Sequence, residues 1–178
     1  MRIIRLLLPI IALISGVLAS RRKKPQSSVA VAPVTPAVDD LLQRAIASPP
    51  DDDALHRLLI DLADDATTLR EKLLPHKDAL LPPLIAMLHS ADTHRRELAA
   101  LALGQLGGQP ARDALVSALG DYSHWIRSAA IRALVEINDQ SVVSVLSPLG
   151  NDPDESVRAD ATHALAHFAA VQMPASAN

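Results

Sequence analysis

Residues 121–134, DYSHWIRSAAIRAL, decide the fold, because the same pattern returns 31 residues later as DPDESVRADATHAL at 152–165. A weaker copy, SADTHRRELAALAL, lies 31 residues earlier at 90–103. All three copies carry an arginine and a run of small and branched apolar residues at fixed positions. Self-similarity at a period of this length is typical of solenoids. The repeat therefore predicts a stack of helical units of equal length.

The period also extends into the segment before each copy, so each unit contains two helical segments. In the first segment the aligned residues are Leu80, Ala111 and Val142; Leu84, Leu115 and Leu146; and Met87, Ala118 and Leu149. In the second they include Ala99, Ala130 and Ala161; Ala102, Ala133 and Ala164; Leu103, Leu134 and Leu165; and Leu106, Ile137 and Phe168. Within each segment the apolar residues follow the i, i+4, i+7 spacing of one helix face. Each pair of helices must then bury its stripes by stacking on its neighbours.

Over residues 76–169 the sequence resembles the HEAT family, and most closely its short repeats of the phycobilisome-lyase type. The resemblance implies an all-α fold, an α-α superhelix. It also implies that Asp121 and Asp152 begin the turn between paired helices. The repeated arginines would stack along the solenoid and pair with the turn aspartate of a neighbouring unit; they are Arg96, Arg127 and Arg158.

The first copy departs from this pattern. Ser90 stands in place of the turn aspartate, with Asp92 nearby, and Arg95 stands where the later copies have Ile126 and Val157. We interpret this copy as a degenerate cap. An anion-binding ladder of the repeated arginines is the functional alternative, but pairing with carboxylates is the ordinary way to bury arginine, so we favour the structural role.

The N-terminus has the features of a membrane segment. Residues 1–24 hold six basic residues and no acid. The apolar stretch covers residues 3–20 if Arg5 snorkels, which is about 27 Å of helix against a hydrocarbon core of about 30 Å. Because Arg21-Arg22-Lys23-Lys24 opposes translocation of the downstream chain, we favour an uncleaved single-pass anchor in a bacterial inner membrane with the domain on the cytoplasmic side. A cleaved signal peptide, which would leave a periplasmic protein, is the alternative.

Composition divides the remainder of the chain. Residues 25–38 contain three prolines and no helical periodicity, so we expect a disordered linker there. Residues 39–75 are expected to form irregular helices, residues 76–171 the repeats, and residues 172–178 a disordered tail.

The charge distribution argues against nucleic acid as a partner. Six of the 17 basic residues lie within 1–24, which leaves 11 against 20 acidic residues, a net charge of −9. Such a domain repels phosphate backbones. The whole chain also has only one Trp, one Tyr and one Phe for stacking on bases, and no Cys for thiolate chemistry or Cys-ligated zinc.

The candidate partner-binding surface is an outward stripe on the second helices, formed by two sets of residues in register. Arg132 aligns with His163, and Gln105 aligns with Glu136 and His167. His163 and His167 lie four residues apart, so both could reach one metal ion, but no third ligand completes a known spacing, and we predict no metal and no cofactor. Tyr122 and Trp125 are expected in the turn before a helix, where a large aromatic residue either anchors a partner or covers the edge of the core.

These features favour a membrane-tethered scaffold that binds a protein or peptide and catalyses nothing. Enzymes built on similar repeats are the alternative. A resemblance to deoxyhypusine hydroxylase fails because no His-Glu dipeptide occurs, and a bilin-lyase-like activity has no evident need of an anchor. A DNA-repair protein would need a basic concave face, which the negative charge contradicts.

Overall fold

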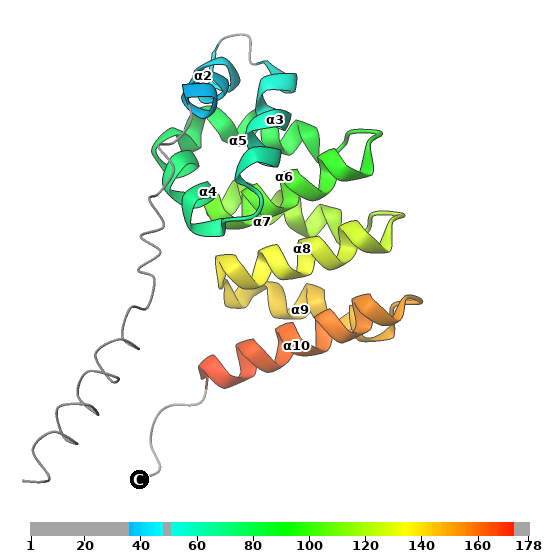
Figure 1. Cartoon of the computed structure of the whole chain (residues 1–178). Coiled ribbons are helices and arrows are strands. Elements are labelled where there is room, and N and C mark those ends of the chain that lie inside the picture. The colour runs from blue at the N-terminus through cyan, green and yellow to red at the C-terminus, as the bar shows by residue number, and fades with distance from the viewer. Residues whose placement is uncertain (1–35, 48–50, 173–178) are drawn as a thin grey trace, which may run out of the picture. The chain divides into compact units, whose positions relative to one another are not determined.

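The computed structural model describes residues 36–47 and 51–172, which form a stack of paired helices (Figure 1). The predicted anchor at 1–24, most of the predicted linker and the predicted tail beyond Gln172 lie outside the described residues. No strand occurs in the part of the chain that is described. Within those same residues, no helix has both the length and the apolar character needed to cross a membrane.

Three helix pairs succeed one another along the chain, so the predicted all-α solenoid is confirmed. The first pair is α5 (Lys77–Met87) and α6 (Thr93–Leu106), and the second is α7 (Gln109–Ala118) and α8 (His124–Ile137). In the third pair the first segment is broken into η2 (Gln140–Val142), α9 (Val143–Leu146) and η3 (Ser147–Asn151), and the second segment is the long helix α10 (Glu155–Gln172). Pro148 lies just after the start of η3, and its missing N–H explains why a regular helix does not continue there.

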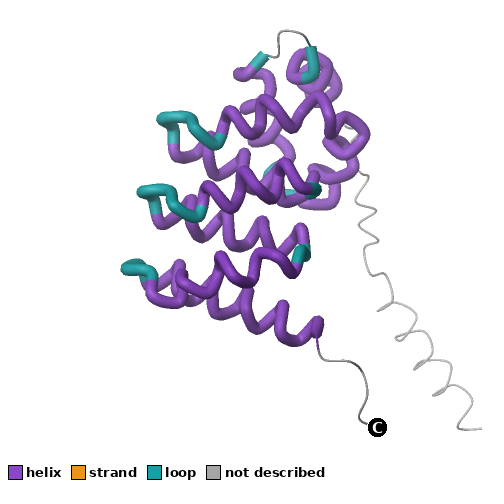
Figure 2. The backbone as a smooth tube through the Cα atoms, turned by 180° about the vertical axis from the view of Figure 1, so that it is seen from behind, coloured by secondary structure: helices purple, strands orange, loops and turns teal. Residues whose placement is uncertain are grey.

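The second helices α6, α8 and α10 lie side by side and form one layer of the stack (Figure 1). Small residues let them approach closely. A Cβ added at Gly104 of α6 would lie 2.9 Å from both Cα and Cβ of Ala133 in α8. The loops that join the paired helices all lie along one edge of the stack (Figure 2). We name this the loop edge; it comprises residues 88–92, 119–123 and 152–154 and the first turn of the helix that follows each of these loops.

The core is built almost entirely from Leu, Ala, Ile and Val. Most of the aligned residues of the repeat are buried, and Leu84, Leu115 and Leu146 are fully buried in successive units. Phe168 is the one aromatic residue of the described core. The register that was visible in the sequence is therefore the register of burial.

The helices before the repeats cover the open side of the first unit. They are α2 (Pro36–Ala45), α3 (Asp52–Leu62), α4 (Ala66–Leu73) and the short η1 (Leu74–His76). Asp51 and Asp65 cap α3 and α4 by accepting backbone N–H groups. Arg95 of α6 donates to Asp53 of α3 at 2.6 Å. The arginine that breaks the repeat pattern thus contacts the preceding helices.

Candidate functional site

Two adjoining grooves run across the layer of second helices. Residues that line the α6–α8 groove include Glu97, Leu101, Gln105, Ala129, Arg132 and Glu136. Residues that line the α8–α10 groove include Ile131, Arg132, Glu136, Asp160, His163 and His167. The grooves enclose about 300 Å³ and about 410 Å³. Arg132 and Glu136 line both grooves, so the grooves adjoin along α8, and we name them together the second-helix face.

The structure brings the five residues of the predicted stripe together on this face: Gln105, Arg132, Glu136, His163 and His167. Gln105 nevertheless differs from the expectation of an outward side chain, since it is only 8% exposed. The reason is that α4 packs against α6 at this end of the layer, and Ala66 at the start of α4 closes the groove. The accessible part of the stripe therefore lies on α8 and α10.

The second-helix face combines an apolar floor with charges that are not used within the domain. Leu101 and Ala129 form part of the floor of the first groove. In the described part of the chain, none of Arg132, Glu136 and Asp160 takes part in an ion pair or hydrogen bond between side chains. Free charges around an apolar floor suit recognition of another chain, because the floor supplies burial and the rim supplies orientation.

The two histidines of the face do not converge on a ligand. His167 Nε2 lies 3.2 Å from Oδ1 of Asn138, the left-handed residue that ends α8, and its ring meets Phe168 edge to face. His163 makes no such contact among the described residues. Within residues 36–47 and 51–172, no group of three or more His, Asp or Glu side chains is arranged to hold a metal ion.

The repeated arginines form a ladder along the loop edge, in which Arg96 and Arg127 reach into the next unit. Arg127 donates from Nε and Nη2 to Asp152 at 2.8 and 2.7 Å, and from Nη1 to the backbone oxygen of Asp121 at 2.9 Å. Arg96 pairs with Asp121 of the next unit less fully: Nη2 donates to Oδ1 at 3.2 Å, whereas Nε lies 3.0 Å from Oδ2 without forming a hydrogen bond. The Arg127 guanidinium holds the pKa of Asp152 below its ordinary value.

The last rung of the ladder lacks its carboxylate. Arg158 donates from Nη1 to the backbone oxygens of Asp152 and Pro153 at 2.8 and 3.0 Å, as the other two arginines do in their own loops. No further unit exists among the described residues to supply an aspartate. The ladder residues are thus held by the fold, and they line neither groove.

Tyr122 and Trp125 lie on the loop edge, away from the grooves. Tyr122 is 78% exposed and Trp125 is 61% exposed. The Arg96 guanidinium lies 4.6 Å from the centroid of the Tyr122 ring. The Trp125 ring packs on the neighbouring His124 ring, with centroids 4.7 Å apart. Both aromatic residues therefore remain largely open to solvent.

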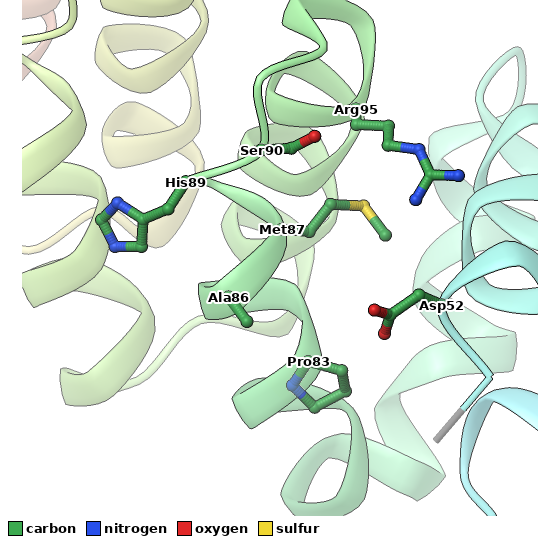
Figure 3. A pocket seen from close by; sticks show the side chains of 7 residues that line it. All are labelled: Asp52, Pro83, Ala86, Met87, His89, Ser90 and Arg95. Carbon is green, nitrogen blue, oxygen red and sulfur yellow. The ribbon is translucent and has the colours of Figure 1, made fainter. Parts of the chain in front are cut away.

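A separate pocket of about 230 Å³ lies between the start of α3, the end of α5 and the loop after α5 (Figure 3). Asp52 and Arg95 project toward it from opposite sides, and Met87 lies between them. Arg95 is already paired with Asp53, which leaves Asp52 as the one unpaired charge that lines it in the described chain. This pocket is smaller than either groove of the second-helix face and has fewer unpaired charges.

Sequence reasoning missed some residues of the second-helix face. Asp160 lies one helical turn before His163, so helix periodicity was a signal that could have placed it on the same groove. Ala66 had no such signal, because it precedes the repeats and reaches α6 only through the packing of α4. Glu97 belongs to a repeat position that holds Ser128 and Ala159 in later units, so register alone did not mark it.

Comparison with known proteins agrees with this architecture. Residues 81–166 match the family model described as HEAT repeats. No curated protein matches the sequence.

Among solved structures, the crystal structure of an engineered protein is similar. It is 26% identical, with a TM-score of 0.51, and the alignment covers 74% of this chain. The chain spans 62% of the length of that protein. A designed armadillo repeat protein, solved in complex with a (KR)4 peptide, is 18% identical with a TM-score of 0.41; 74% of this chain and 73% of that one are covered.

Proposed function

Because the chain is a HEAT-like repeat protein, we propose that it is a non-catalytic scaffold that binds a protein or peptide partner on the second-helix face. A solenoid of this kind presents a continuous surface across successive units, which suits an extended or helical segment of another chain. The floor of the grooves buries apolar side chains of the partner, and the free charges on the rim set its register.

One observation carries the proposal, namely that the two grooves adjoin along α8 and share Arg132 and Glu136. Two separate pockets of this size would each hold a single side chain. An adjoining pair that spans α6, α8 and α10 offers room for a segment several residues long. The rim also has more acidic than basic side chains, with Glu97, Glu136 and Asp160 beside Arg132, so a partner with some positive charge fits it better than an acidic one.

Selection of binders from a random peptide library against the full chain tests the proposal. Enriched peptides are expected to bind with micromolar affinity and to lose at least tenfold on Glu136→Lys, because the substitution reverses the charge shared by both grooves. Glu71→Lys is the matched control, since Glu71 is exposed on α4 and lines neither groove. Equal binding to the Glu136→Lys variant, or equal loss on both variants, would contradict the proposed surface.

We also propose that the scaffold is tethered to a membrane through residues 3–20, with the domain in the cytoplasm. The support is the apolar stretch and the basic cluster directly after it. Fractionation of cells that express the full chain should recover it with membranes after carbonate washing, whereas a chain that lacks residues 1–24 should be in the soluble fraction. Recovery of a shortened, freely soluble form of the full chain would favour the cleaved signal peptide instead.

A further inference from the structure

The two exposed aromatic residues of the loop edge are not needed by the repeat that contains them. At the position of Tyr122 the other units have Ala91 and Pro153, and at the position of Trp125 they have His94 and Ser156. The loops of those units occupy equivalent positions along the same edge of the stack (Figure 2). Small or polar residues therefore suffice for the fold at both positions.

Exposure shows that the aromatic side chains do little for the core. Trp125 is 61% exposed and Tyr122 is 78% exposed. Most of the surface of each side chain therefore faces water and does not pack on the protein. The chain has only three aromatic residues, and two of them occupy this one loop and helix start. Exposed Trp and Tyr are the side chains that most often anchor a partner.

The surroundings of Trp125 favour a positive charge. One face of its ring packs on His124, and His124 Nδ1 lies 3.4 Å from Oδ2 of Asp154 in the next loop. The next residue, Glu155, is exposed and has no ion pair in the described chain. A cation over the open face of Trp125 would be attracted by the ring and by these carboxylates together.

The loop edge already contains one contact of this chemistry. The Arg96 guanidinium lies over the Tyr122 ring at 4.6 Å from its centroid, while it pairs with Asp121. It shows how an arginine is held here, by an aromatic face on one side and an aspartate on the other. At Trp125 the ring packs on His124, which in turn faces Asp154, and no arginine or lysine of the described chain contacts the Trp125 ring or the Asp154 carboxylate.

We propose that Trp125, with Asp154 and Tyr122 beside it, is a docking site for an arginine or lysine side chain of a partner protein. This inference rests on the proposed binding role and concerns a surface separate from the grooves. A partner that binds both the grooves and the docking site would be held at two points, along the second helices and at the loop edge. A lipid surface is a poorer occupant, because the domain carries a net charge of −9 outside residues 1–24 and repels anionic headgroups.

Binding at this site can be followed by tryptophan fluorescence, because Trp125 is the single tryptophan of the chain. The full chain is titrated at physiological salt with a short arginine-containing peptide, and with the same peptide in which citrulline, the neutral isostere, replaces each arginine. A saturable change in tryptophan emission is expected with the arginine peptide, and an affinity at least fivefold weaker with citrulline. Asp154→Asn should weaken arginine binding about as much. An equal response to both peptides, or none to either, would overturn the proposal.

Further variants separate the docking site from the fold, the grooves and a membrane. Trp125→Ser carries the residue of the third unit, should unfold at the same temperature as the natural chain, and should lose binding of a labelled arginine peptide by anisotropy. Glu136→Lys in the groove should leave the emission change intact, so the two surfaces can fail independently. Abolition by Glu136→Lys would place the peptide in the grooves and overturn the docking site. A blue shift on neutral lipid vesicles without a response to the arginine peptide would overturn it in favour of a membrane contact.

Discussion

At the residue scale, the units are joined by arginines whose charge is neutralised by the next unit. One nitrogen of Arg127 donates to a backbone oxygen of its own loop, and two others donate to the Asp152 carboxylate of the next unit. Both side chains are mostly buried. A buried ion pair contributes little net stability. Removal of one partner, however, leaves the other charge buried and unpaired, which destabilises the folded state.

Arg127→Gln is therefore expected to destabilise the domain by about 3 kcal/mol, since it leaves the buried Asp152 carboxylate unpaired. Arg158→Gln provides the internal control. It removes the same kind of side chain and the equivalent bonds to loop carbonyls but strands no carboxylate, so a loss of about 1 kcal/mol is expected. Urea unfolding of the two variants gives the comparison. Equal losses would mean that the carboxylate contact has no special weight.

A second arginine contact between units predicts a dependence on pH. Arg112 of α7 donates to Asp139 Oδ2 at 2.7 Å, and this contact, with bonds from Ser141, lowers the pKa of Asp139 from 3.8 to about 2. A carboxylate whose pKa is lower in the folded state adds stability that is complete above the unfolded pKa and is lost as the pH falls through the folded pKa. The contribution of Asp139 should thus be present at pH 5 and largely gone at pH 2.

Unfolding of the natural chain and of Asp139→Asn between pH 5 and pH 2 measures this contribution. The gap in stability between them should be widest at pH 5 and should narrow below about pH 4. In an Arg112→Gln background the gap at pH 5 should be smaller, because Arg112 is the main cause of the lowered pKa. A gap that stays constant with pH would show that Asp139 acts only through the uncharged cap it provides to η2.

The sequence pattern predicted the positions of the ladder arginines, but it did not predict which contacts each arginine makes. The period of 31 residues aligned the three arginines, and the resemblance implied their partners. The role of Arg95 was not readable, because its partner Asp53 lies 42 residues away in a helix outside the repeat. Burial of Gln105 was hidden for the same reason, since α4 has no equivalent in the later units. Contacts between repeats are visible in a periodic sequence, and contacts with non-repeated elements are not.

At the element scale, the layer of second helices depends on small residues at the points of closest approach. Gly104 of α6 faces the backbone of α8 at Ala133. In the sequence Gly104 lies close to Gly107 and Gly108, a pattern typical of a helix end. The structure keeps Gly104 inside α6, before the helix ends at Leu106, and the close approach of the two helices explains the absence of a side chain.

Gly104→Ala is expected to destabilise the domain by about 1–3 kcal/mol, although alanine favours helices, because its Cβ would force α6 and α8 apart. Gly120→Ala is the matched control. Gly120 lies in a loop, and an added Cβ would meet only the backbone oxygen of Ser117 at an ordinary 3.6 Å. Thermal unfolding should show a clear drop for the first variant and little change for the second. A neutral Gly104→Ala would mean that the two helices can separate at small cost.

At the scale of the whole domain, the two ends of the solenoid are finished in different ways. The first unit is covered by α2, α3 and α4, which bury its open side. The last described unit has no such cover, and its outer positions are polar or small instead. Thr162 and Ala166 of α10 are exposed where α8 has Ile131 and Val135, and those two residues line the groove between α8 and α10. An outer face of this kind keeps a solenoid end from associating with other surfaces.

Restoring the inner pattern at this end should therefore make the domain associate. In the double variant Thr162→Ile and Ala166→Val, the outer face of α10 would carry the apolar pair that α8 buries against its neighbour, so a stable complex of two or more chains is expected at tens of micromolar protein. Light scattering after size-exclusion chromatography measures it. The control is Thr162→Ser and Ala166→Ser, which changes the same positions without adding apolar surface and should keep the elution of the natural chain. If the apolar variant also eluted like the natural chain, the side chains of α10 would not be what limits growth of the stack, and the broken first segment of the last unit, η2, α9 and η3, would be the better explanation.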